Sequence, residues 1–176
     1  NEEYIELVDF LNSHSLVSDA NYEVVAGQID ISNYIDYMLS QIYFDNRDWP
    51  GNNIKYWKSK EEESKWRWLM YDTDFGFGIY DGNAYTLNTI QFALEPNNTD
   101  WPNPSWSTLL FRKLTENTKF KNAFINRFAD MMNTTFIADR VVAKIDSIAN
   151  ILQPEIYRHY QRWGAPSESG WNAAVQ

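Results

Sequence analysis

The chain has 176 residues, of which 44% are apolar and 16% aromatic, so it has ample material for a hydrophobic core. Its 24 Asp and Glu against 15 Lys and Arg give a net charge of -9, the opposite sign to that of most nucleic-acid-binding proteins. It has no cysteine and no apolar run near the roughly 20 residues that span a bilayer. The composition therefore predicts a globular segment, without a disulfide framework, a membrane span or a nucleic-acid partner.

Two helices are predicted in the first part of the chain. Residues 2–14 place Ile5, Val8 and Leu11 near helical spacing, with glutamates in the first turn. Residues 31–42 carry a continuous apolar stripe at i, i+3, i+4, i+7, i+8 and i+11, and Asp30 or Ser32 is a suitable cap. The second pattern predicts a core helix.

A polar loop and a hairpin are predicted next. Residues 45–53 are turn formers that include Pro50 and Gly51, which end the helix. Residues 54–57 and 66–71 are short aromatic and aliphatic runs separated by a charged tip, as in a two-stranded hairpin. Residues 79–104 show no sustained period, which predicts a long irregular segment.

Helices are predicted again in the last third of the chain. The expected ranges are 105–114, 119–132 and 138–164, and Pro154 is expected to interrupt the last of them. Residues 165–176 are expected to be a linker or a frayed end.

Two polar segments flank the predicted hairpin, and together they are the part of the sequence that indicates a function. Protein kinases have a catalytic loop H-R-D-x-x-x-x-N, then a hairpin, then the triplet D-F-G. Arg47, Asp48 and Asn53 have the spacing of the first motif, with Asn46 in place of the histidine. The second motif is matched by Asp74, Phe75 and Gly76. Each motif alone is weak, whereas the ordered combination is much rarer and favours a functional interpretation.

The residue types suit phosphoryl transfer. Magnesium prefers hard oxygen ligands, which Asp72, Asp74 and Asn53 offer. A separate carboxylate must face the attacking hydroxyl, and Asp48 is the candidate for that catalytic role. The literal D-F-G spacing favours Asp74 over Asp72 as the main metal ligand, and Asn53 and Asp74 are the candidates for holding the cofactor.

The same residues resemble the spore coat protein H (CotH) kinase family, whose members show D-x-x-x-N-N, an aromatic strand and then W-D-x-D-x-x-F-G. The first part is matched by Asp48, Asn52, Asn53, Ile54 and Tyr56. The second part is matched by Tyr71, Asp72, Thr73, Asp74, Phe77 and Gly78, with Tyr71 in place of the usual tryptophan. The resemblance extends from about Asp30 to Pro154.

The resemblance implies an α+β fold, a mostly helical kinase-like C-lobe with a β-hairpin between two acidic motifs. It implies Mg²⁺ and ATP as cofactors, phosphate transfer to a protein hydroxyl, and a bacterial, exported, cell-surface or spore-coat protein. Residues 1–164 are then expected to be the C-terminal lobe of a larger protein. The partner N-terminal lobe, with its lysine and phosphate-covering loop, is not recognisable before Asp30, so this segment alone is expected to be inactive.

Two other readings compete with the kinase. A non-enzymatic cell-surface or carbohydrate-binding module would use loop tryptophans, for which Trp49, Trp101, Trp106 and Trp163 are candidates. A glycosidase would use two of the loop carboxylates, at a separation that the sequence does not give.

Overall fold

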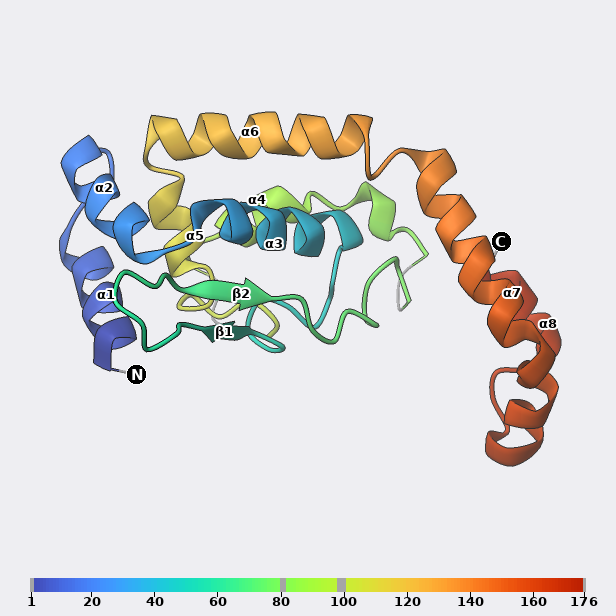
Figure 1. The fold of residues 1–176 in the computed structure, drawn as a ribbon. Helices are drawn as coiled ribbons and strands as arrows, with labels where there is room; N and C mark the ends of the chain where they lie inside the picture. Colours follow the sequence, from blue (N-terminus) through green and yellow to red (C-terminus); the bar gives the residue numbers. More distant parts are fainter. Residues whose placement is uncertain (1, 80–81, 98–100, 176) are drawn as a thin grey trace. The chain divides into compact units, whose positions relative to one another are not determined.

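The computed structural model describes residues 2–79, 82–97 and 101–175. It divides after Arg127 into two compact units, which are described separately below. The described part is mostly helical with one two-stranded antiparallel hairpin, which confirms the predicted α+β class. In chain order the elements are α1 (Glu2–Ser13), α2 (Asp19–Gln28), α3 (Ile31–Phe44), β1 (Lys55–Trp57), β2 (Arg67–Leu69), η1 (Ala84–Thr86), α4 (Thr89–Leu94), α5 (Leu109–Leu114), α6 (Thr118–Asn133), α7 (Ala138–Trp163) and α8 (Glu168–Val175) (Figure 1).

Helix α3 is the centre of the first unit. The Asp30 side chain caps it by accepting a 3.1 Å hydrogen bond from the backbone N–H of Asn33, as the sequence suggested. Its apolar stripe is buried, including Ile35, Met38 and Leu39. The helix ends at Asp45, whose backbone is left-handed with φ 47°. The element that the strongest periodicity predicted is therefore the one that leads into the first polar segment.

The hairpin is fastened to α3 by an asparagine and by aromatic rings. The Asn33 amide oxygen accepts from the backbone N–H of Trp68 at 2.6 Å, and its Nδ2 donates to the Trp68 carbonyl at 3.2 Å. The Trp68 ring meets Tyr34 edge-on, with centroids 4.5 Å apart. Figure 1 shows the hairpin running along α3. These contacts hold the hairpin against the first turn of α3, and the chain after β2 then runs back to the other end of α3, where the polar segment begins.

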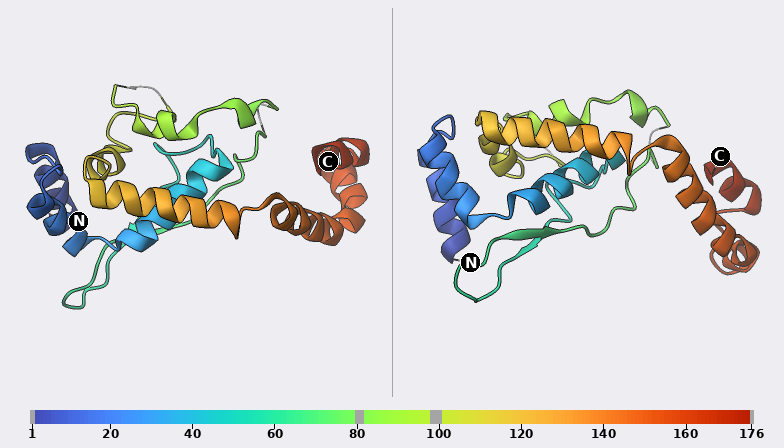
Figure 2. Two further views of the ribbon diagram at one scale, coloured as in Figure 1. Left: turned by 90° about the horizontal axis from the view of Figure 1, so that it is seen from above. Right: turned by 45° about the horizontal axis from the view of Figure 1, so that its top comes forward.

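An aromatic cluster joins α5 to the first part of α6. Phe111, Phe120 and Phe124 lie within 6.4 Å of one another, measured between ring centroids, and all three are buried. Arg127 forms a two-pronged ion pair with Asp36 on α3, at 2.6 and 3.0 Å. Figure 2 shows this part of α6 crossing α3. The residues from 109 to 127 therefore close the core on the side of α3 away from the hairpin.

Three elements differ from the sequence predictions in the first unit. Helix α2 was not predicted; only Tyr22 and Val25 of its residues are buried, so it has no apolar stripe to detect. The segment 79–104 was expected to be irregular, yet it contains η1 and α4. The Asn88 side chain caps α4 by accepting from Gln91 N–H, which starts a helix too short to show a period.

The second unit corrects two further expectations. Helix α7 continues from Ala138 to Trp163 without a break at Pro154, although proline cannot donate a backbone hydrogen bond there. It ends at Gly164, whose φ of 76° suits glycine. Residues 168–175, expected to be a linker or frayed end, form α8, which packs on α7. Within the described residues, the structure contains no helix of the length and apolar character that a membrane span requires.

Candidate functional site

The carboxylate of Asp48 is held by two neighbouring asparagine amides. Asn52 Nδ2 donates to both carboxylate oxygens, at 3.1 and 3.0 Å, and Asn53 Nδ2 donates to Oδ2 at 2.6 Å. Each amide uses its nitrogen in these bonds, so the Asn53 carbonyl oxygen is left to face another group. The two asparagines of the D-x-x-x-N-N pattern therefore bond to its aspartate and fix the orientation of the Asp48 carboxylate.

Asn46 connects the two acidic segments. Its side-chain oxygen accepts from the backbone N–H of Asp48 at 3.1 Å, and its Nδ2 donates to Gln41 Oε1 at 2.9 Å and to the Asp72 carbonyl at 3.4 Å. The side chain is only 1% exposed. The sequence noted Asn46 only as a replacement for histidine, whereas in the structure it joins the Asp48 loop to the Asp72 backbone.

The loop around Asp48 is anchored on both sides. The Trp49 ring is buried and its indole N–H donates to the Tyr37 hydroxyl at 3.1 Å. Gly51 lies against residues 102–104: its N–H donates to the Pro102 carbonyl, and a Cβ added there would lie 2.5 Å from a Pro104 ring carbon. Only glycine fits this approach without displacement. The loop is therefore fixed by contacts from residues far along the chain.

The second acidic segment is a tight turn fastened to the end of α3. Arg47 N–H donates to the Phe75 carbonyl at 3.1 Å, and Phe77 N–H donates to the Phe44 carbonyl at 2.7 Å. Gly76 has no room for a Cβ, which would lie 2.9 Å from the Phe44 oxygen. These bonds bring the Asp72–Asp74 turn beside the Asp48 loop.

Three carboxylates meet at this junction. The pKa of Asp72 is raised above its ordinary value of 3.8, first by a side-chain hydrogen bond with Asp74, then by partial desolvation and by the charges of Asp74 and Asp48. Lys55 opposes this effect, and its ammonium lies 3.4 Å from the centre of the Tyr71 ring. The Asp72–Asp74 pair therefore concentrates negative charge within electrostatic reach of Asp48.

Several of these residues have a left-handed backbone. The φ angles are 47° at Asp45, 53° at Asn53 and 51° at Asp72. Asp and Asn tolerate this region better than other side-chain-bearing residues, and such angles gather where structure holds functional groups in place. The turn-forming residue types, read in the sequence only as loop formers, are therefore needed by the conformation itself.

The donor set fits a hard divalent cation. Asp72 and Asp74 interact through their side chains, and Asn53 bonds to Asp48 through its nitrogen, which leaves its amide oxygen as a further donor atom. Carboxylate and amide oxygens are ligands that magnesium prefers. In the described residues, no group of three or more His, Cys, Asp or Glu side chains is arranged to hold a metal ion by itself. Kinase metal sites use few protein ligands because phosphate oxygens and water complete the shell, so Asp72, Asp74 and Asn53 could hold a cation only together with such ligands.

The tryptophan candidates separate into two groups. Trp49 is buried and anchors its loop, so it is not an exposed surface ring of the kind that a carbohydrate-binding module would use. Trp101, Trp106 and Trp163 are each more than 60% exposed.

Asp45, which the sequence did not single out, is buried and accepts a hydrogen bond from Thr89 Oγ1 at 2.9 Å. The Arg47 guanidinium lies 3.2 Å from the same oxygen. Asp45 belongs to the scaffold of the Asp48 loop.

The model of the family described as CotH kinase protein matches residues 1–176, the whole chain. No curated protein matches the chain. No solved structure matches it either.

Proposed function

Since the chain belongs to the CotH kinase family, we propose that it carries the phosphate-transfer face of an atypical protein kinase. The observation that supports this most is that the Asp48 carboxylate is held by two amides and lies within electrostatic reach of Asp72. In this proposal Asp48 faces the acceptor hydroxyl, and Asp72, Asp74 and Asn53 are the metal ligands.

The role of Asp48 follows from its hydrogen bonds. A carboxylate that accepts three amide hydrogen bonds has a fixed direction, and a fixed acceptor can align a hydroxyl for attack. Such a residue acts on turnover more than on nucleotide affinity, because it contacts the hydroxyl and not the metal.

Asp72, Asp74 and the Asn53 carbonyl oxygen would hold Mg²⁺. When bound, the cation neutralises the charge of the ATP phosphates and positions them for transfer. A cation between Asp72 and Asp74 also removes the repulsion that raises the Asp72 pKa. Asp74 is proposed as the main ligand, as the D-F-G spacing favours.

The wider assignment is also part of the proposal. The acceptor is a protein hydroxyl, a nucleotide-covering N-terminal lobe belongs to the same protein, and the protein acts at a bacterial cell surface or in a spore coat. Support comes from the family and from the exposed apolar residues Trp57, Leu69 and Met70 on the hairpin, beside the acidic turn. Such a surface offers a contact for a further lobe or for a nucleotide base.

The proposal is tested by transfer of γ-phosphate from labelled ATP in the full-length protein, with ATP affinity measured by calorimetry. Asp74→Ala should abolish transfer, because it removes a metal ligand. Asp48→Ala should lower turnover by at least 10²-fold with a smaller effect on ATP affinity. Asp9→Ala, an exposed change on α1, is the matched control.

The outcomes separate the competing readings. Undiminished transfer by Asp74→Ala would contradict its assigned role. A full-length protein that neither binds ATP nor transfers phosphate, yet binds a sugar through Trp101 or Trp106, would support the carbohydrate-binding module instead.

A further inference from the structure

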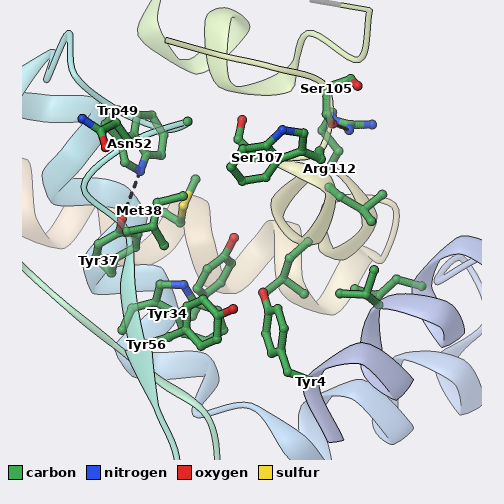
Figure 3. Close-up of a pocket in the computed structure, with 18 of the residues that line it drawn as sticks. Tyr4, Tyr34, Tyr37, Met38, Trp49, Asn52, Tyr56, Ser105, Ser107 and Arg112 are labelled. Carbon is green, nitrogen blue, oxygen red and sulfur yellow. Dashed lines mark hydrogen bonds between the residues drawn. The ribbon is translucent and has the colours of Figure 1, made fainter. Parts of the chain in front are cut away.

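A cavity of about 820 Å³ lies within the first unit, on the amide side of Asp48. This volume falls in the range of ligand-binding pockets. The cavity lies between α1, α3, the hairpin and α5, and its walls include Asn52 and Asn53, which hold the Asp48 carboxylate (Figure 3). Neither Asp72 nor Asp74 lines it. The cavity therefore reaches the two amides that hold Asp48 but not the acidic turn.

The walls of the cavity are mostly aromatic. Tyr4 stacks on Tyr56 with centroids 4.3 Å apart, and Trp106 is exposed at 63% and also lines the cavity. The described lining contributes aliphatic side chains as well, such as Leu110. An occupant must therefore present an apolar or aromatic surface.

Phenolic hydroxyls in the walls have bonding capacity to spare. Tyr34 is 3% exposed and lines the cavity, yet its hydroxyl has no hydrogen-bond partner among residues 2–79, 82–97 and 101–175. The Tyr4 hydroxyl, on a partly exposed side chain, likewise has no partner among the described residues, whereas Tyr37 accepts from Trp49. Both Tyr4 and Tyr34 line the cavity, so an occupant with polar atoms of its own could bond to their hydroxyls.

The charge of the described cavity lining is opposite in sign to the net charge of the whole chain. The chain has a net charge of -9, but no Asp or Glu is among the described residues that line the cavity. Arg112 is the one charged side chain of that described lining. Within the described part of the chain it forms no salt bridge; it donates to the Thr108 hydroxyl and to the Ser105 carbonyl. Burial lowers the pKa of Arg112, and the charge of Glu95, which does not line the cavity, opposes this change. Three of the five N–H donors of Arg112 remain for an acceptor.

We propose that this cavity is the acceptor site and takes a polypeptide segment in which an apolar or aromatic side chain lies near the phosphorylated hydroxyl and an acidic side chain pairs with Arg112. The inference rests on the proposed function. A peptide fits the placement because Asn52 and Arg112 lie on opposite sides of the cavity in Figure 3, so one segment can reach both. Its backbone amides would satisfy Tyr4 and Tyr34.

The test compares serine peptides as substrates of the full-length protein. One peptide carries Phe and Glu beside the serine, the second replaces Glu with Lys, and the third replaces Phe with Gly. We expect the Glu peptide to have a KM about tenfold below that of the Lys peptide, with a similar kcat, because a charge-assisted pair to a half-buried Arg acts in binding. The Gly peptide should also lose about tenfold in KM.

Variants assign the preference to the cavity. Arg112→Glu should reverse the preference between the Glu and Lys peptides, while Lys121→Glu, an equal charge change at an exposed position of α6, should leave it unchanged. Because Arg112 also supports residues 105–108, Tyr4→Phe gives a second variant: it keeps the ring, removes the hydroxyl and should raise KM about threefold for the Glu peptide.

Peptide affinity measured by calorimetry without nucleotide separates the two proposals. Preferential binding of the Glu peptide without any phosphate transfer would support the cavity assignment and contradict the kinase. Phosphate transfer with equal KM for the Glu and Lys peptides would overturn the cavity assignment alone. Equal effects of Arg112→Glu and Lys121→Glu, or occupation of the cavity by a sugar in place of peptide, would overturn it as well.

Discussion

The two acidic segments are built in opposite ways. In the Asp48 loop the carboxylate is matched by amide donors, and the neighbouring Trp49 and Asn46 are buried. In the Asp72–Asp74 turn the two carboxylates face each other, and the Asp72 pKa is raised as a result. The hydrogen-bonding capacity of Asp48 is used by amides of its own loop. The repulsion between Asp72 and Asp74 would instead be relieved by a bound cation.

The difference is consistent with the two roles that we propose for the segments. A carboxylate whose hydrogen bonds are all made inside the chain keeps one direction, which suits a group that orients a hydroxyl. Carboxylates held against their mutual repulsion need scaffolding, and here the scaffold is the end of α3 through Phe44 and Arg47. Changes in the first segment should therefore cost stability, whereas neutralisation in the second should not.

The largest stability effect is expected for Trp49→Ala. The side chain is 1% exposed and bonded to Tyr37, so its removal leaves a large cavity and an unpaired hydroxyl. We expect a loss of about 3–5 kcal/mol in the free energy of unfolding, measured by urea denaturation. Trp106→Ala, at an exposed ring, is the control and should change stability by under about 0.5 kcal/mol.

Alkaline pH should weaken the same region. Burial raises the pKa of Tyr37 to about 12, and hydrogen bonds with Gln41 and Trp49 oppose this rise. The stabilising contribution is present below the ordinary value of 10 and is lost as pH rises toward 12, by roughly 3 kcal/mol at most. Unfolding curves between pH 9 and 12 measure this loss, and Tyr37→Phe should reduce its slope. An unchanged slope in that variant would contradict the assignment.

Asn46→Ala should break the link between the two segments. It leaves the Asp48 N–H and the Gln41 amide without their partner, at a cost of about 2 kcal/mol in unfolding free energy. NMR chemical shifts should change at Asp72 as well as at Asp48. Asn52→Ala, at an exposed amide, is the control; if it disturbs Asp72 as much as Asn46→Ala does, then Asn46 is not the link.

The smallest effect is expected at Asp72. Its raised pKa means that the protonated form is favoured in the fold, so this contribution is present below the ordinary 3.8 and is lost as pH rises through the raised value. Titration of the carboxyl carbon by NMR should give a midpoint above 3.8, and Asp74→Asn should move it down. A midpoint that does not respond to Asp74→Asn would show that the two side chains do not interact.

The sequence predicted the elements that carry their own pattern. The apolar stripe of α3 with its Asp30 cap, and the two aromatic and aliphatic runs of the hairpin, could be recognised without any distant contact. Helix α2 has little apolar periodicity, so the sequence did not predict it. Pro154 predicted an interruption of the last helix, whereas α7 continues through this residue. These elements depend on neighbours that a local pattern does not contain.

The site shows the same division. The residues of the two motifs could be named from spacing alone, because the hairpin brings its two ends together. The roles of Asn46 and Asp45 could not, since each depends on a partner 26 or 44 positions away, Asp72 and Thr89. The aromatic cavity is formed by segments as distant in sequence as those of Tyr4 and Arg112, so no local sequence pattern predicts it.

The central claim, that the two acidic segments form one cation-binding and hydroxyl-orienting site, is tested most directly by manganese titration observed by NMR. Mn²⁺ broadens resonances near its site, so the account predicts that Asp72, Asp74 and the Asn53 side-chain amide broaden first, and that Asp74→Asn removes this effect. Broadening that begins instead at the glutamates of the hairpin tip, residues 61–63, and is indifferent to Asp74→Asn would contradict the account.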